Sequence, residues 1–418
     1  KYIIILLFIS NCSFTKNEKN KNENLKDIFK KTEPIEKELN QQLKIKKLNT
    51  FKQRPFLKNN NNNNGNINFD SNFENISNYK ISKIKKFNSN QPELFFTQDE
   101  NIIFFNGKGT IFKLTQNLKE LWKVNNYNKK EKKLNPILYF AQIDKKLIVN
   151  DNLSKMYSVN IDEGKVIWSK YSSSSFNSDI KVYEDKFISI DFDNVIRAIS
   201  SKDGTELWNF KTDNSFIKSQ KKLSIILKDE IVFFINNLGD VTALDVNNGS
   251  LVWQTPTQSS LIYQEAFSLE NSDLVFENDT IYFSNNKNEF FSIDARTGII
   301  KWTQSINSSL RPTIIESLIF TVSNEGYLFV IDDRTGNILR ITDVLTNFKN
   351  RDKIKPTGFI HGNQKIFLSL SNGRLLIINS STGFQEKIIK LHGSKISRPS
   401  VFNNNMYLIK DNAIVKIN

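Results

Sequence analysis

Short apolar runs separated by polar turns recur from about residue 93 to the end of the chain. β-Branched and aromatic residues dominate the runs, and Asn, Asp and Gly separate them at spacings typical of antiparallel strands. Examples are Ile231–Ile235, Thr280–Phe283 and Lys365–Leu368. Runs of this length and composition predict an all-β structure rather than helices.

A fixed spacing of turn residues and tryptophans makes these strands a repeat. The clearest copy has Val241–Asp245, a turn that ends at Gly249, and then Ser250–Trp253. Six glycines occupy the turn position, namely Gly164, Gly204, Gly249, Gly298, Gly336 and Gly383, and the residues four positions later are Trp168, Trp208, Trp253, Trp302, Arg340 and Lys387. The glycines are 40, 45, 49, 38 and 47 residues apart, which is the length of one propeller blade.

Each position of the repeat has a physical reason. The polar residue four before each glycine, such as Asp245, caps the turn by accepting backbone N–H groups, and the glycine supplies a positive φ. The tryptophan falls on the outermost strand, where we expect it to fill the wedge between blades. The alternative role, a ligand-stacking cage, would need the tryptophans gathered at one place, whereas one per repeat distributes them around a ring.

The ends of the repeat array predict how the ring closes. Each hairpin has room for two preceding strands, which gives four-stranded antiparallel blades. The first repeat keeps Trp122 but lacks the turn glycine, and the last repeat ends after three strands, at 400–402, 406–409 and 413–417. An N-terminal strand near Tyr79–Lys86 would complete that last blade and remove its open edge. We therefore predict an eight-bladed β-propeller over residues 76–418, although seven or nine blades also fit the sequence.

The first 75 residues have a different composition. Residues 13–75 are rich in Asn, Lys, Glu and Gln and include the run Asn59–Asn64, so we expect a disordered, low-complexity linker. Residues 1–12 comprise Lys1, the apolar run Tyr2–Ile9 and a polar end at Cys12, the only cysteine. This pattern predicts a secretory signal peptide, and its apolar run is too short to span a bilayer. It resembles a bacterial lipoprotein signal, which implies a lipid on Cys12; a non-lipidated signal peptide is the alternative.

The net charge of +14 does not indicate a nucleic-acid partner. Residues 1–90 hold 18 Lys and Arg against 8 Asp and Glu, or +10, which leaves +4 for the other 328 residues. The positive charge is therefore concentrated in the Asn-rich segment and its flanks. Lysines scattered through such a segment are typical of a solvated tail, whereas duplex binding needs a basic stripe on a folded surface.

No arrangement of residues in the sequence predicts catalysis or a metal or cofactor site. The two histidines, His361 and His392, each adjoin Gly and are expected to be exposed loop residues. Asn106–Thr110 joins two short strands and opens no helix, so we interpret it as a turn and not as a phosphate loop. The paired acids Asp332 and Asp333 have the spacing of a blade turn, which explains them without acid–base chemistry.

The Ala-Leu-Asp, turn-Gly, Trp pattern at Ala243–Asp245, Gly249 and Trp253 resembles the PQQ-type propeller repeat, over about residues 93–418. This resemblance implies a fold more than a function, because the repeat serves both quinoprotein dehydrogenases and non-enzymatic scaffolds. The quinoproteins would need a vicinal cysteine pair that stacks on the cofactor, and Cys12 is alone. The resemblance therefore favours a protein without a cofactor.

A lipoprotein signal followed by eight such blades resembles the BamB family of outer-membrane assembly lipoproteins. The resemblance implies a non-enzymatic scaffold on the periplasmic face of the outer membrane, anchored by lipid and bound to the POTRA domains of the barrel subunit. It places partner contacts at Phe216, Ile217 and Lys218, with Lys where the family usually has Arg, and at Asp273. Two alternatives remain open for the whole protein, a periplasmic PQQ-type quinoprotein or other enzyme, and a propeller that binds another envelope partner or a glycan; residues 216–218 could also form an ordinary inter-blade loop.

Exposed blade edges offer a separate route to client proteins. An edge strand has unpaired backbone groups that an extended segment of another chain can pair with. We therefore expect that unfolded outer-membrane protein precursors bind to the propeller edges.

Overall fold

The inner strands of each repeat are buried on both faces, whereas the outermost strand is half exposed. In β15 (Ile231–Ile235) four of five residues are buried, whereas β17 (Leu251–Thr255) contains only exposed and partly exposed residues. This difference arises because neighbouring sheets cover both faces of the inner strands, and the outer strand lies at the rim. The structure is a computed structural model that describes residues 33–49, 63–69, 73–84, 92–213, 221–257, 269–391 and 393–418.

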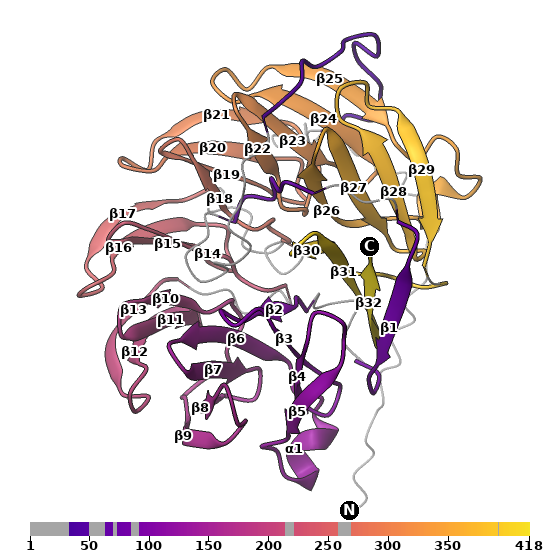
Figure 1. The fold of residues 1–418 in the computed structure, drawn as a ribbon. Coiled ribbons are helices and arrows are strands. Elements are labelled where there is room, and N and C mark those ends of the chain that lie inside the picture. Colours follow the sequence, from indigo (N-terminus) through magenta and orange to yellow (C-terminus); the bar gives the residue numbers. More distant parts are fainter. Residues whose placement is uncertain are drawn as a thin grey trace, which may run out of the picture. The chain divides into compact units, whose positions relative to one another are not determined.

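Thirty-two strands of the described residues form eight four-stranded antiparallel sheets within the unit Pro34–Asn418, which confirms the predicted eight-bladed propeller. Figure 1 shows the labelled sheets following one another around a ring. Blades 1 to 4 are β2 (Phe95–Phe96), β3 (Ile102–Phe105), β4 (Ile111–Leu114) and β5 (Glu120–Val124); β6 (Leu138–Ile143), β7 (Lys146–Asp151), β8 (Lys155–Asn160) and β9 (Val166–Tyr171); β10 (Lys181–Tyr183), β11 (Lys186–Ile190), β12 (Val195–Ser200) and β13 (Glu206–Lys211); and β14 (Ile225–Lys228), β15, β16 (Val241–Asp245) and β17.

The other four blades have the same order. They are β18 (Val275–Glu277), β19 (Thr280–Ser284), β20 (Phe290–Asp294) and β21 (Ile300–Gln304); β22 (Thr313–Ile315), β23 (Leu318–Val322), β24 (Tyr327–Asp332) and β25 (Ile338–Asp343); β26 (Pro356–Gly362), β27 (Lys365–Leu370), β28 (Arg374–Asn379) and β29 (Gln385–Lys390); and β30 (Ser400–Phe402), β31 (Asn405–Lys410), β32 (Ala413–Ile417) and β1 (Ile76–Lys80). The short helices are α1 (Lys129–Lys133) and the 3-10 helix η2 (Arg351–Lys353). No helix in the described ranges has the length and apolar character needed to cross a membrane.

The N-terminal strand β1 completes blade 8. It pairs antiparallel with β32, from Ile76 opposite Ile417 to Lys80 opposite Ala413. Figure 1 shows β1 beside β32 at the C-terminal end of the chain. The strand begins three residues before the expected Tyr79–Lys86 and ends at Lys80. Its pairing removes the open edge that three strands alone would leave.

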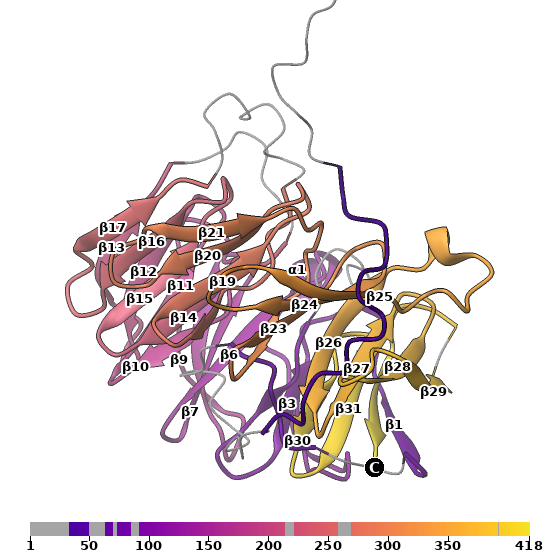
Figure 2. The same ribbon diagram turned by 90° about the horizontal axis from the view of Figure 1, so that it is seen from above.

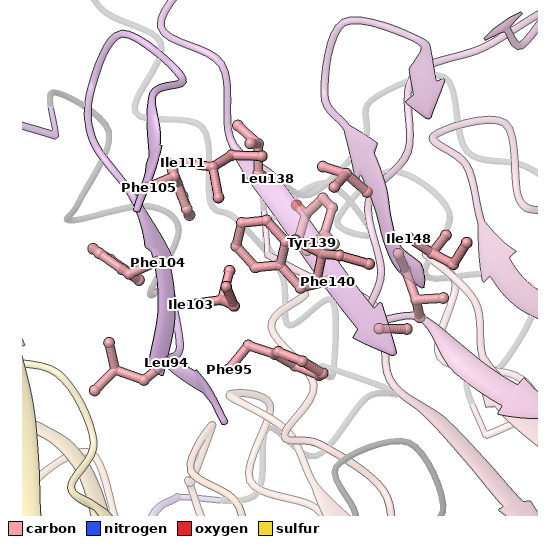
Figure 3. Close-up of a cluster of buried hydrophobic side chains, with 14 of the residues drawn as sticks. Leu94, Phe95, Ile103, Phe104, Phe105, Ile111, Leu138, Tyr139, Phe140 and Ile148 are labelled. Carbon is pink, nitrogen blue, oxygen red and sulfur yellow. The ribbon is translucent and has the colours of Figure 1, made fainter. Parts of the chain in front are cut away.

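The core runs between the blades. Aromatic and aliphatic residues from blades 1 and 2 interdigitate there (Figure 3). Phe105 on β3 and Phe140 on β6 lie with their ring centroids 6.1 Å apart, and Phe95 lies 6.4 Å from Phe140. The ring closes in the same way, because Phe96 of blade 1 stacks on Phe402 of blade 8 with a centroid distance of 4.7 Å.

Two parts of the range for which composition predicted a flexible linker are packed against the blades. We call residues 34–49 the strap and residues 63–69 the central segment. Leu39 of the strap forms an antiparallel bridge with Ile341 of β25, and Figure 2 shows the indigo strap running beside β25. Buried Leu48 and Phe69 anchor the two segments. A few buried apolar residues and several backbone hydrogen bonds hold the two segments. The overall composition of residues 13–75 does not indicate which residues make these contacts.

Candidate interaction surfaces

The five tryptophans lie in the seams between consecutive blades. Each indole Nε1 donates to a backbone carbonyl in the turn of the next blade at 3.0–3.1 Å. The pairs are Trp122 with Ile161, Trp168 with Ser201, Trp208 with Val246, Trp253 with Ala295 and Trp302 with Asp333. Each tryptophan therefore joins two blades through a partly buried hydrogen bond in addition to its apolar contact.

The turn glycines lie in the same seams, close to the tryptophan rings. Gly249 has a φ of 73°, and a Cβ there would lie 2.6 Å from the Trp208 ring. The sequence predicted the positive φ of this glycine. It did not predict the close approach of the indole, which also excludes a side chain here. Gly164, Gly204, Gly298 and Gly336 also lie beneath the tryptophan of the preceding blade, whereas Gly383 lies against Thr342.

Blade 6 departs from this pattern because Arg340 stands in place of tryptophan. Its guanidinium is fully buried, and Nη2 donates to the Ser380 carbonyl at 2.8 Å, at the repeat position that accepts from tryptophan in the other seams. Nη1 donates to the Ser381 carbonyl and, at 3.0 Å, to the Leu43 carbonyl of the strap. Burial lowers the pKa of Arg340 to about 10. The Arg340 side chain therefore binds blade 7 and the strap together.

The strap is held along its whole length. Leu39 and Ile341 exchange two backbone hydrogen bonds of 3.1 and 3.0 Å, and Tyr327 donates to the Glu36 carbonyl at 3.0 Å. Farther on, Ile45 donates to the Ser381 carbonyl at 2.9 Å. The strap thus pairs with the edge of blade 6 through one antiparallel bridge and then crosses to blade 7.

Charged side chains from five blades meet at the centre of the ring. This central cluster consists of Glu93, Asp179, Lys222, Asp273 and Arg311, each of which lies just before the first strand of its blade. Lys222 of blade 4 contacts Glu93 of blade 1 at 3.3 Å and Asp179 of blade 3 at 3.0 Å. Arg311 of blade 6 contacts Glu93 at 3.1 Å. Residues of blades so far apart in the ring can meet only near its axis.

Asp273, predicted to contact a partner, belongs to this cluster. Arg311 donates to its Oδ2 through Nε at 2.7 Å and also through Nη2. Burial favours the neutral acid, but the charges of Arg311 and Lys222 outweigh burial and hold the pKa of Asp273 below its ordinary value. The carboxylate is therefore ionised and already bound within the chain, so a partner would have to reach it from the ring centre.

The other predicted partner residues, Phe216, Ile217 and Lys218, lie outside the described residues, as does Cys12. The residues that follow them are anchored to the central cluster. Lys221 donates to the Ser309 carbonyl at 2.5 Å, and burial lowers its pKa to about 8. Lys222 pairs with two acids there. The described part of blade 4 therefore begins, at Lys221 and Lys222, beside the ring centre.

The central segment occupies part of the ring centre. Asn63 donates to the Leu274 carbonyl at 2.9 Å and accepts from Lys181 Nζ at 3.0 Å. Asn64 exchanges two hydrogen bonds with the backbone of Ile314, at 2.7 and 3.0 Å. Sequence reasoning missed these contacts because both residues belong to an Asn run. The nearby Phe69 and Phe73 were the sequence features that could have indicated that this segment packs against the blades.

His361 is not the exposed loop residue that its Gly neighbour predicted. It lies in β26, is fully buried, and its ring centroid is 5.2 Å from that of Phe320. Its backbone bonds the central segment, since its N–H donates to the Gly65 carbonyl at 3.1 Å. Burial lowers the pKa of His361 to about 3, so the ring is neutral. His392 lies outside the described residues.

Comparisons with known proteins agree with this architecture. A family model described as "Outer membrane protein assembly factor BamB" matches residues 107–342, more than half of the chain. The fold is similar to the crystal structure of BamB from Moraxella catarrhalis, with a TM-score of 0.64, 14% identity, and coverage of 82% of this chain and 97% of that one. No curated protein compared with the chain matches it significantly.

Two other solved structures have the same fold. The computationally designed protein Ika8 gives a TM-score of 0.60 at 13% identity and covers 82% of this chain and 97% of its own. The quinohemoprotein alcohol dehydrogenase ADHIIG from Pseudomonas putida HK5 gives 0.59 at 10% identity, with 82% and 76% covered. At these identities the likeness concerns the fold alone.

Proposed function

Since the chain belongs to the family of outer membrane protein assembly factor BamB, we propose that it is a non-enzymatic scaffold lipoprotein of the outer-membrane β-barrel assembly (BAM) complex. In this role it binds the POTRA region of the barrel subunit and assists the insertion of outer-membrane proteins. The family match carries the proposal. The proposed location is the periplasmic face of the outer membrane, with Cys12 as the lipid attachment site.

The residues present do not fit the quinoprotein alternative. Its cofactor would need a vicinal cysteine pair, and the chain has one cysteine. All five tryptophans donate to backbone carbonyls in the seams, away from the charged ring centre. In the described part of the chain, no three His, Cys, Asp or Glu residues are grouped so that they could hold a metal ion. The single cysteine and the placement of the tryptophans therefore argue against the quinoprotein alternative.

Charge reversal at Lys218 tests the proposed contact with the barrel subunit. We expect Lys218→Glu to reduce co-purification of the barrel subunit from outer membranes, because a basic residue there would pair with an acidic partner surface. Lys165→Glu is the matched control, since Lys165 is an exposed turn lysine on blade 2. Equal recovery with both variants would contradict the assignment of this contact.

The proposed anchor has its own test. Cys12→Ala should abolish palmitate labelling and release the protein from the membrane fraction, because acylation requires the thiol. Labelling that persists in this variant would rule out Cys12 as the site.

The edges of the other blades support client binding as a second part of the role. Val252 on β17 and Ile167 on β9 are about half exposed, whereas the strap covers the corresponding edge of blade 6. Backbone pairing with a blade edge, at the single bridge between Leu39 and Ile341, therefore already occurs within this chain. A photo-crosslinker at Val252 should capture unfolded outer-membrane protein precursors more strongly than one at Leu339, where the strap bonds. Equal or absent capture would contradict client binding at the edges.

A further inference from the structure

The seam between blades 5 and 6 contains a polar pocket of about 730 Å³. Blade 5 contributes Thr280, Tyr282 and Lys301, and blade 6 contributes Glu316 and Asp333. Every described residue that lines the pocket has a polar side chain. Its volume falls within the range of about 300–1,000 Å³ that is typical of small-molecule sites.

Asp333 is not explained by the turn in which it lies. The preceding Asp332 caps that turn, because its Oδ1 accepts the backbone N–H groups of Arg334 and Thr335 at 3.1 and 2.9 Å. The backbone of Asp333 also serves the fold, since its carbonyl accepts from Trp302. Its side chain, by contrast, is only 8% exposed, and Oδ1 is buried without a hydrogen-bond partner among the described residues.

The repeat does not require an acid at this position. The equivalent residues in the other seams, which also offer their carbonyl to the preceding blade, are Ile161, Ser201, Val246, Ala295 and Ser380. Burial and the charge of the neighbouring Asp332 raise the pKa of Asp333, and the charge of Arg334 offsets them only in part. A buried, unpartnered carboxyl oxygen is unfavourable for stability. This chain therefore retains, at the wall of the pocket, an acid that its own fold does not need and whose Oδ1 is left unpaired within the described residues.

The charges around the pocket restrict the ligand. Two acids, Asp333 and Glu316, face two bases, Lys301 and Arg334. Lys301 Nζ is 3.3 Å from Asp294 and donates to Thr280 at 2.8 Å, and Glu316 accepts from the Asn49 backbone of the strap at 3.0 Å. A purely cationic ligand would meet both bases and a purely anionic one both acids. Hydroxyl groups both donate and accept, so a neutral polyol suits this lining.

We propose that this pocket binds a small neutral carbohydrate, with a sugar hydroxyl donating to Asp333 and others accepting from Lys301 and Arg334. The pocket lining includes no residue of the central cluster and none of those assigned to the barrel subunit, so the proposal does not depend on the proposed function.

Ligand-observed NMR on the full chain, with glucose, N-acetylglucosamine and maltose as separate probes, tests the proposal. We expect saturable binding of at least one of them, and at least tenfold weaker binding in Asp333→Ser, which introduces the residue found at positions 201 and 380. Glu163→Gln, in the corresponding turn of blade 2, should bind as the unmodified chain does. Asp333→Ser should also melt at a higher temperature, because it removes the buried Oδ1 that has no hydrogen-bond partner among the described residues.

Three results would overturn the proposal: no binding of any sugar, unchanged binding in Asp333→Ser, or saturable binding of glycine or spermidine in place of the sugars. Lys301→Gln provides a second variant that leaves the buried carboxyl in place. It should weaken sugar binding at least threefold, and unchanged affinity would remove Lys301 from the site.

Discussion

Trp208 and Arg340 occupy the same repeat position in blades 3 and 6, yet they join the blades in different ways. Trp208 makes one hydrogen bond, to the Val246 carbonyl at 3.0 Å, and packs its ring beneath Gly249. Arg340 donates hydrogen bonds to three backbone carbonyls. Two belong to blade 7, at Ser380 and Ser381, and one belongs to Leu43 of the strap. The tryptophan seam is closed by two blades alone, whereas the arginine seam is completed by a third segment. The repeat thus tolerates loss of its tryptophan where another part of the chain supplies the missing contacts.

Truncation of the tryptophan should have the largest effect. We expect Trp208→Ala to lower the free energy of unfolding by about 3–5 kcal/mol, because it removes a large aromatic side chain and leaves a cavity between the blades. Urea unfolding followed by fluorescence and circular dichroism would measure the loss. A loss below 1 kcal/mol would mean that the indole is not important for the seam.

Removal of Arg340 should cost somewhat less and should also release the strap. We expect Arg340→Ala to destabilise the protein by about 3 kcal/mol, since several buried carbonyls lose their donor. Hydrogen exchange should rise in residues 34–49 and not in β13. Arg340→Trp restores the repeat residue, so it should keep most of the stability and still increase exchange in the strap. Protection of the strap in both variants would contradict the role assigned to Arg340.

The arginine seam should also be the acid-sensitive one, because His361 lies in it against Phe320. The pKa of His361 in the folded protein, about 3, is below its ordinary value of 6.5. The unfolded chain therefore binds a proton near pH 6.5 that the folded chain does not bind. The stability that depends on neutral His361 is complete above pH 6.5 and decreases as the pH falls toward 3.

At pH 4, which lies 2.5 units below the ordinary pKa of 6.5, this loss should amount to about 3 kcal/mol, at about 1.4 kcal/mol per pH unit. His361→Gln should remove that part of the pH dependence of unfolding. A variant of the Trp208 seam, such as Trp208→Ala, provides the comparison. An unchanged pH profile in the variant would show that His361 does not carry the effect.

The two seams also differ in how far the sequence predicted them. The spacing of Gly249 and Trp253 repeats along the chain, so the blades, their order and the seam positions follow from local pattern and close packing. Sequence reasoning recognised Arg340 as a lost tryptophan but not its partner, the strap, because the backbone and side-chain groups that bind the strap lie about 300 residues away in the sequence. The surroundings of Asp333 and Asn63 were not predicted for a related reason. Local sequence explains Asp333 as a turn acid and Asn63 as part of a linker, but the tertiary structure places both in other surroundings.

Substitution of a turn glycine should have a smaller effect than loss of the tryptophan. Gly249→Ala forces a side chain into a positive φ and brings its Cβ to 2.6 Å from Trp208. The backbone contribution alone is about 1–2 kcal/mol. A double-mutant cycle with Trp208→Ala separates the two causes, because the alanine at position 208 removes the clash but not the backbone strain. Strict additivity would show that the close approach of the indole contributes nothing.

The smallest expected effect concerns one backbone hydrogen bond of the strap. Leu39→Pro removes the N–H that donates to the Ile341 carbonyl at 3.1 Å. We expect a cost of about 1 kcal/mol, confined to the strap, because the blades close without this bond. Leu39→Ala keeps the N–H and is the matched control, so hydrogen exchange in residues 34–49 should rise more in the proline variant. If both variants exchanged alike, the strap would be held at this point by its side chain, and the backbone bridge to blade 6 would contribute little to its attachment.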